Sequence, residues 1–550
     1  MKRVWEIISK KQTSVGSAAM ILVTMVLTSR LLGLARDRLL ASRFAPEELG
    51  VYFAAFRLPN FIFELLVTGA LTSAFIPVFT KYLTQDKEKE GWYMASTVIN
   101  ISVLLFALFA LPILIWAPAF SRFLAPGFSE HQITIMATFS RIMIICQVTP
   151  LLIGNFFTGI LQSYNLFLMP ALAPVIYNIG IIIGIVTLTG AIGLYAPVVG
   201  VGIGALLFML IQLPILLRVG YRHAFKLDIH NKGVKEVGKL IGPRTLGLAA
   251  SQIDSTIDLM LSSLLGARMV TIFNFAQNLQ QVPIGLFGAT VAQAALPTLS
   301  AASVREDGEQ FKRSVISAIH QILFFVLPSS VFFIILRIPL VRLIFGASRF
   351  DWQATYLTGM TLLTFSLSLF AQSVTHVLAR GFYALYDTKT PVIISIISIA
   401  TNSIASVLFI LVFHLPVWSL GLSASIASIL NTLLLFVLLD KKIGHFPLGS
   451  LFGSPIKMFF ASIVAGIFIY IPLKLFDQLV FDTTRTVGLI LLTGTAGGTG
   501  LAVYVAMSWL FNVGEVQSFF ALLRRVRRGA PVLLEPASEV VSDSGQDKLA

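Results

Sequence analysis

The chain consists of long apolar runs separated by short polar segments. Fourteen runs stand out, at approximately 15–42, 50–80, 94–120, 133–160, 168–191, 195–218, 236–265, 269–300, 314–345, 354–384, 391–414, 417–439, 455–475 and 486–511. Each is long enough for the roughly 20 residues that a helix needs to cross a bilayer. The runs are continuous and do not alternate, which excludes a membrane β-barrel. The pattern predicts an all-α polytopic membrane protein with fourteen transmembrane helices.

Composition supports this class and excludes others. Of the 550 residues, 56% are apolar and only 12% are charged, against roughly 25% charged residues in soluble domains. A soluble enzyme or a disordered chain is therefore excluded. The single cysteine, Cys146, allows neither an intrachain disulfide nor a cysteine-based metal site.

The net charge of +14 follows from topology. Lys and Arg concentrate in alternate loops, roughly five to one, as the positive-inside rule requires of cytoplasmic loops. Both termini are therefore predicted to lie in the cytoplasm. The excess of positive charge needs no nucleic-acid partner to explain it.

The spacing of the runs predicts an internal duplication. Phe53 and Pro77 match Phe273 and Pro297 at an offset of 220, and Tyr164-Asn165 matches Tyr386-Asp387 at 222. Six helices per repeat give both halves the same orientation, and hence a pseudo-two-fold axis along the membrane normal. The alternative is coincidence between apolar segments of similar composition.

This duplication defines the predicted domains. They are an N-terminal lobe at 1–218, a cytoplasmic linker at 219–235, a C-terminal lobe at 236–440, an extra helix pair at 455–512 and a cytoplasmic tail at 513–550. The glycine-rich stretch 494–500 lies inside the last run, and we interpret it as a close helix contact.

Ionisable residues inside the first two runs are the main candidates for substrate binding. Arg30, Arg36 and Arg57 are predicted to line a cationic cavity, because a guanidinium stays charged and binds phosphate with two parallel hydrogen bonds. Asp37 and Glu64 are the supporting carboxylates, with Glu64 favoured as the partner of Arg57. The alternatives are snorkelling of Arg36 and Arg57 to the interface, and a structural pairing of Arg30 with Asp37.

The seventh run carries a second candidate site. Asp254 and Asp258 lie one helical turn apart, and Asn402 provides an amide in the eleventh run. Such oxygens suit a monovalent cation at Asp258, or a proton. The alternative is capping of neighbouring helix backbone.

Three motifs resemble the MurJ (MviN) family of the multidrug/oligosaccharidyl-lipid/polysaccharide exporter superfamily. They are Ser29-Arg30-Leu31-Leu32-Gly33-Leu34-Ala35-Arg36-Asp37, the pair Arg57-Leu58-Pro59-Asn60 and Gly69-Ala70-Leu71-Thr72-Ser73-Ala74-Phe75-Ile76-Pro77, and the stretch from Val377 to Pro391. The resemblance covers about 1–512, with matching number and order of runs.

The resemblance implies a lipid II flippase, which moves the undecaprenyl-diphosphate-linked peptidoglycan precursor to the outer leaflet of a bacterial cytoplasmic membrane by alternating access. The protein would be a transporter without a cofactor, and not an enzyme, with a role in cell wall biogenesis and cell shape. Sodium or proton coupling, the other membrane-lipid contacts and the oligomeric state are left open.

Site residues carry over from the family one by one. Arg30 and Arg36 match its cavity arginines, and Asp258 and Asn402 match its cation site. Phe63 and Asn278 stand where the family has further arginines, and Ser406 where some members have a carboxylate. An exporter of another lipid-linked glycan is therefore the main alternative, and a cation-coupled drug antiporter is a weaker one.

Overall fold

The computed structural model describes residues 15–64, 66, 74–477 and 486–517, with side chains described outside 15–23 and 240–251. Its contacts divide the chain into two compact units. Unit 1 is Met1–Thr271 with Ile344–Ala354, and unit 2 is Ile272–Leu343 with Thr355–Ala550. The helix that begins the second half of the sequence repeat thus makes its contacts in unit 1. The domain boundaries predicted from the sequence stay a prediction.

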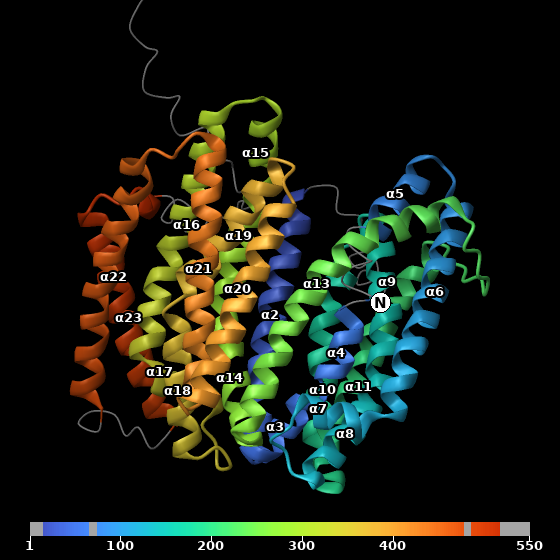
Figure 1. Cartoon of the computed structure of the whole chain (residues 1–550), viewed down its shortest axis with the longest axis horizontal. Helices are drawn as coiled ribbons and strands as arrows, with labels where there is room; N and C mark the ends of the chain where they lie inside the picture. Colours follow the sequence, from blue (N-terminus) through green and yellow to red (C-terminus); the bar gives the residue numbers. More distant parts are fainter. Residues whose placement is uncertain (1–14, 65, 67–73, 478–485, 518–550) are drawn as a thin grey trace, which may run out of the picture. The chain divides into compact units, whose positions relative to one another are not determined.

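Long helices dominate both units (Figure 1). Those up to residue 264 are α2 Val15–Arg43, α3 Pro46–Ala55, α4 Arg57–Phe63, α5 Ile76–Thr84, α6 Glu88–Ile115, α7 Ala117–Leu124, α8 Glu130–Met143, α9 Thr149–Ser163, α10 Leu168–Ile192, α11 Tyr195–Leu210, α12 Leu213–Arg218 and α13 Lys232–Leu264. A π-helical turn, Ile144–Val148, joins α8 to α9.

The remaining helices follow the same pattern of long spans and short connecting helices. They are α14 Ala267–Pro283, α15 Thr290–Val304, α16 Gly308–Ile335, α17 Arg337–Phe345, α18 Trp352–Ser366, α19 Leu369–Ala384, α20 Lys389–Val407, α21 Trp418–Ile443, α22 Leu448–Phe476 and α23 Thr486–Leu510. Further π-helical turns follow α14, at Ile284–Ala289, and α20, at Leu408–Val412. Side chains at the helix starts cap α13 and α16, through Asn231 and Asp307.

Most of the predicted spans are present. Among the described residues, ten helices are long and apolar enough to cross a membrane, and the pair α18 and α19, bent by 43°, makes an eleventh. The three other predicted runs, at 15–42, 50–80 and 236–265, are largely helical where they are described but fall outside this set. Each of them includes positions outside the described residues or side chains, at 15–23, 65 with 67–73, and 240–251. The all-α polytopic membrane fold is confirmed.

Local backbone details recur between the two halves of the sequence. Left-handed residues repeat 220 to 224 positions apart, in the pairs Asp86 and Glu306, Asn165 and Tyr386, Gly193 and His414, and Gly220 and Gly444. Asn165 therefore corresponds to Tyr386 in backbone conformation, at an offset of 221. The sequence match paired Asn165 with Asp387, at an offset of 222. Such recurrence at non-glycine positions, where a positive φ is uncommon, supports a duplicated chain.

Helices α10 and α11 pack through glycine. A Cβ added at Gly180 would lie 2.4 Å from the Cα of Gly204, and one at Gly184 would lie 2.4 Å from the Cα of Gly200. The obstacle in both cases is backbone, which does not rotate away. This contact positions α10, the helix that carries Asn178 to the candidate site.

We expect Gly184→Ala to destabilise the protein by about 1–3 kcal/mol, the usual cost of overpacking. The matched control is Gly190→Ala on the same helix, where nothing lies within 4 Å of the added Cβ. Thermal unfolding in detergent measures both. Equal melting temperatures for the two variants would show that α10 and α11 can move apart at this position without loss of stability.

Candidate functional site

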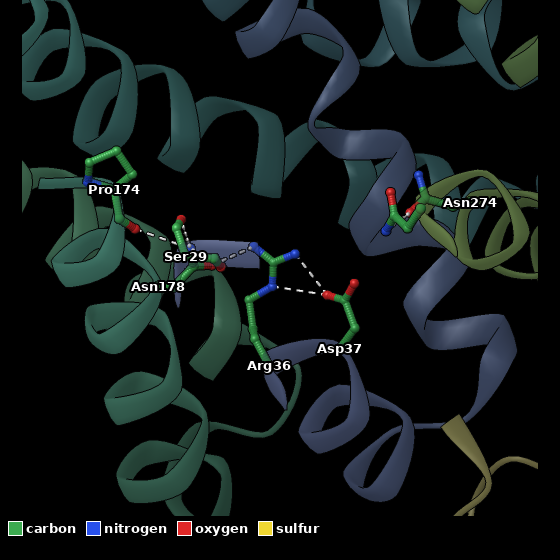
Figure 2. A network of polar contacts seen from close by, with 7 residues as sticks. Ser29, Arg36, Asp37, Pro174, Asn178 and Asn274 are labelled. Atoms are coloured by element: carbon green, nitrogen blue, oxygen red, sulfur yellow. Dashed lines mark hydrogen bonds and ion pairs between the residues drawn. The ribbon is translucent and has the colours of Figure 1, made fainter. Parts of the chain in front are cut away.

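Arg36 and Asp37 form a buried ion pair on α2. The Nε and Nη2 groups of Arg36 donate to the same carboxylate oxygen of Asp37, over 2.9 and 2.8 Å (Figure 2). Asp37 is 2% exposed. Adjacent residues on a helix do not normally face each other, and the long arginine side chain bridges the difference. Asp37 is thus the partner of Arg36 in this structure, and its role as a supporting carboxylate of a substrate site stays a prediction.

Asn178 of α10 completes this group. Its side-chain oxygen accepts from Nη1 of Arg36 over 3.2 Å, while its amide nitrogen lies 3.1 Å from both the hydroxyl of Ser29 and the carbonyl of Pro174 (Figure 2). Asn178 is 7% exposed. The amide thus holds α2 against α10 and fixes the direction of the guanidinium. The sequence analysis missed this residue, although an isolated Asn in a run as apolar as 168–191 was a signal for it.

Arg30 lies on the same helix and is partly buried. Gly33, the glycine between Arg30 and Asp37, lies in ordinary surroundings, since an added Cβ would have only the Asn178 side-chain oxygen within 4 Å, at 3.9 Å. Within the described part of the chain, no backbone of a neighbouring helix therefore comes close to Gly33. The neighbour at this position is a side-chain amide and not a backbone.

Arg57, at the start of α4, contacts α13. Its Nε donates to the Thr256 hydroxyl over 2.9 Å, and its Nη2 donates to the Gln252 carbonyl. It also interacts electrostatically with Asp258, Asp254 and Glu64. The predicted partnership of Arg57 with Glu64 stays a prediction, and Arg57 has the two aspartates as further carboxylates nearby. Two groups that the sequence analysis treated as separate sites, Arg57 and the aspartates, lie together in unit 1.

Asp258 is the more buried of the two aspartates, at 7% exposed, whereas Asp254 is partly buried. In this conformation the Arg57 guanidinium supplies positive charge beside both carboxylates. The described residues contain no group of three or more His, Cys, Asp and Glu side chains that could hold a metal ion. Oxygens of amides, hydroxyls or backbone would have to complete the coordination of a cation at Asp258.

The other predicted site residues lie in unit 2. Asn402 is buried, and its side-chain oxygen is 3.5 Å from the Ser406 hydroxyl, which in turn is 2.6 Å from Ser423. Asn278 donates to the side-chain oxygen of Asn274, one turn earlier on α14, over 3.2 Å. Neutral amides and hydroxyls thus occupy the positions where the resemblance places charged groups.

Unit 2 also contains an apolar cavity of about 700 Å³. Phenylalanines of α16 line it, together with Tyr504 and Gly494 and Gly498 of α23. Gly497 and Gly500 of the same stretch make tight contacts, because an added Cβ would lie 2.7 Å from Phe332 and 2.2 Å from Ile469. The glycine-rich stretch therefore makes close helix contacts, as predicted, and the same glycines line the cavity.

Comparisons with known proteins agree on the family. The family model for lipid II flippase MurJ matches residues 44–491. A lipid II flippase MurJ of Burkholderia cenocepacia is 29% identical over 76% of this chain and 82% of its own. A probable lipid II flippase MurJ of Buchnera aphidicola is 25% identical over 90% of this chain and 98% of its own.

Solved structures give the same result. A lipid II flippase MurJ in an inward closed conformation superposes with a TM-score of 0.75 at 25% identity, covering 90% of this chain and 98% of that one. An inward-facing multidrug resistance MATE family transporter of the MOP superfamily gives a TM-score of 0.63 at 17% identity, over 78% and 98% of the chains. The second likeness shows a shared fold only.

The fold and the buried charges on its helices define a polytopic membrane transporter, and not an enzyme. The family model covers most of the length. The chain belongs to the lipid II flippase MurJ family.

We expect Asp37→Asn to destabilise the protein, because an amide cannot neutralise the buried Arg36 guanidinium. Breaking a buried pair costs about 3–5 kcal/mol, an upper limit here since the Arg36 side chain is 23% exposed. The matched control is Glu130→Gln, which breaks the exposed pair with Arg122 at a cost of about 0–1 kcal/mol. Melting temperatures that fall equally in both variants would contradict a buried pair.

Proposed function

We propose that this protein flips lipid II from the inner to the outer leaflet of a bacterial cytoplasmic membrane by alternating access, with both termini in the cytoplasm. Membership of the MurJ family supports the substrate, and the lysine and arginine distribution supports the orientation. The observation that carries the proposal is the partly buried Arg36, whose guanidinium is held by Asp37 and Asn178. A guanidinium at this place neutralises a diphosphate that must cross an apolar layer, where unpaired charge is prohibitive.

The geometry of Arg36 suits this task. A guanidinium has five N–H donors, and three of them are used by Asp37 and Asn178. The remaining two, one on Nη1 and one on Nη2, are not used by these partners, and we assign them to phosphate oxygens. Arg30, one to two turns earlier on α2, is the second phosphate ligand in this proposal.

An exporter of another lipid-linked glycan is the second candidate. The observation that favours it is the replacement of two family arginines by Phe63 and Asn278. Asn278 is engaged with Asn274, so it provides an amide dipole where the family provides a charge. A drug antiporter for cations fits less well, because the first unit presents arginines at this depth.

Complementation of a strain depleted of its lipid II flippase tests the function. We expect the unaltered chain to restore growth, Arg30→Ala to abolish flipping, and Arg30→Lys to restore it partly, since an ammonium keeps the charge but loses the planar fork. Arg36→Ala should also impair flipping. Outer-leaflet lipid II and protein level are measured for each variant.

The matched control for these variants is Arg122→Ala, which removes an exposed arginine far from α2 in the sequence. Normal flipping by a well-expressed Arg30→Ala protein would remove the cationic cavity from the mechanism. Failure of the unaltered, well-expressed chain to restore growth would favour another lipid-linked glycan.

We further propose that a sodium ion or a proton couples to transport at Asp258, with Asp254 beside it. The burial of Asp258 and the adjacent carboxylate support this. The neighbouring Arg57 complicates a simple test, since Asp258→Asn leaves that guanidinium with one carboxylate fewer. A loss of transport in this variant would follow either from loss of the coupling ion or from the unbalanced charge of Arg57.

A double variant separates them. We expect Asp258→Asn to lower transport and remove any sodium dependence, and Asp258→Asn with Arg57→Gln to recover the melting temperature without recovering sodium dependence. Transport into vesicles with and without a sodium gradient provides the measurement. Sodium dependence that persists in either variant would exclude Asp258 as the coupling residue.

A further inference from the structure

The segment that connects α12 to α13 does not extend into the solvent. It folds back along α6, as the green segment beside that helix in Figure 1 shows. The Asn100 amide of α6 donates to the carbonyls of Ala224 and Lys226 over 2.8 and 3.0 Å, and the Ser96 hydroxyl accepts from the Ala224 amide over 3.1 Å. We call residues 224–229 the strap.

A histidine secures the start of the strap. His223 Nε2 lies 2.9 Å from the Asn100 side-chain oxygen, and its Nδ1 lies 2.6 Å from the Tyr221 hydroxyl. Because the amide of Asn100 donates to two carbonyls, its oxygen must accept, so Nε2 carries the hydrogen and Nδ1 accepts from Tyr221. Burial lowers the pKa of His223, which favours this neutral imidazole. The strap is thus fixed in place by a fully matched set of donors and acceptors.

The depth of the contact along α6 is informative. The charged end of α6 carries Glu88, Lys89 and Glu90, and the helix is a membrane span from Glu88 to Ile115. Asn100 lies ten residues beyond Glu90, which is about 15 Å at 1.5 Å per residue. Trp92 and Tyr93, residue types typical of the membrane interface, lie between them. The strap therefore lies beside the apolar part of α6 and not beyond its end.

The strap presents apolar side chains outward. Phe225 is 91% exposed, Leu227 58% and Ile229 61%, and they alternate with Lys226 and Asp228. Three large apolar groups at alternate positions would be unfavourable in water. Beside the lipid-facing surface of a span they are favourable, because the surroundings are acyl chains.

Basic residues surround the strap in the sequence. Between positions 218 and 239 there are six, namely Arg218, Arg222, Lys226, Lys232, Lys235 and Lys239, against the acidic Asp228 and Glu236. Glu236 is already paired with Lys81. Such an excess next to a membrane span is attracted to anionic lipid headgroups.

We propose that the strap is a membrane anchor, which inserts Phe225, Leu227 and Ile229 among the acyl chains of the cytoplasmic leaflet while the neighbouring lysines and arginines bind anionic phospholipid headgroups. The partner is the bulk phospholipid of the bilayer and not the transported substrate. The anchor ties the connection between the first six and the following spans to the membrane surface. It stands whether or not the transported lipid is lipid II.

Site-directed spin labelling tests this anchor. In a Cys146→Ala background, Phe225→Cys is labelled with a nitroxide and compared with Lys87→Cys, an exposed position in another loop of the same predicted side. Both proteins are reconstituted in phosphatidylcholine bilayers with and without phosphatidylglycerol. Collision of the label with oxygen, which dissolves in lipid, and with a water-soluble nickel chelate measures depth.

We expect a several-fold higher ratio of oxygen to nickel collisions at position 225 than at position 87, and a further rise when phosphatidylglycerol is present. Arg222→Glu with Lys226→Glu should remove that further rise. Asn100→Ala should lower the ratio at position 225, because the strap loses its attachment to α6. Complementation by these variants is scored separately.

Three results would overturn the anchor. Nickel access at position 225 equal to that at position 87 would place the strap in water. Shielding from both oxygen and nickel would mean that protein covers it. A ratio that does not respond to phosphatidylglycerol would exclude the anionic headgroup as partner.

Discussion

The need to pair charge inside an apolar helix bundle determines the arrangement around α2. A guanidinium removed from water must recover its hydrogen bonds and its counter-charge from the protein. Arg36 obtains the charge from Asp37 and a hydrogen bond from Asn178. Asn178 in turn binds Ser29, so α10 is held against α2 by the same group. The glycine contact of α10 with α11 then extends this fixed geometry outward.

The same constraint bears on the helices that carry the candidate charges. Helices α2 and α13 are less hydrophobic on average than helices such as α10 and α11. A helix with several charges inserts only if neighbouring helices compensate them. The contact of Arg57 with α13 is such a compensation, because it sets a guanidinium beside two carboxylates. The helices that carry the candidate functional residues are therefore also the less hydrophobic ones.

Sequence analysis predicted the fold well, and the partners of the charged groups poorly. Apolar runs are long and continuous, so helix limits such as Leu168–Ile192 lie within a few residues of those expected at 168–191. The contacts of long side chains are harder to predict, because Arg36 reaches an adjacent residue and Arg57 reaches a helix almost 200 positions away. The spacing of residues along a helix predicts the position of each Cβ, but not the position of the guanidinium at the end of an arginine side chain.

These pairings also limit how the proposed transport works. A carrier that returns without substrate must change conformation without an unpaired charge in the apolar layer. Asp37 neutralises Arg36 and so meets this requirement. A diphosphate brings more negative charge than a single guanidinium offsets. It must therefore either share Arg36 with Asp37 through the two remaining N–H donors or draw on a further cation, and Arg30 on the same helix is the arginine placed for this. Arg57 is less suited, because it is engaged with Gln252 and Thr256 of α13. In the proposed transport, substrate neutralisation therefore falls to α2, and Arg57 balances the aspartates.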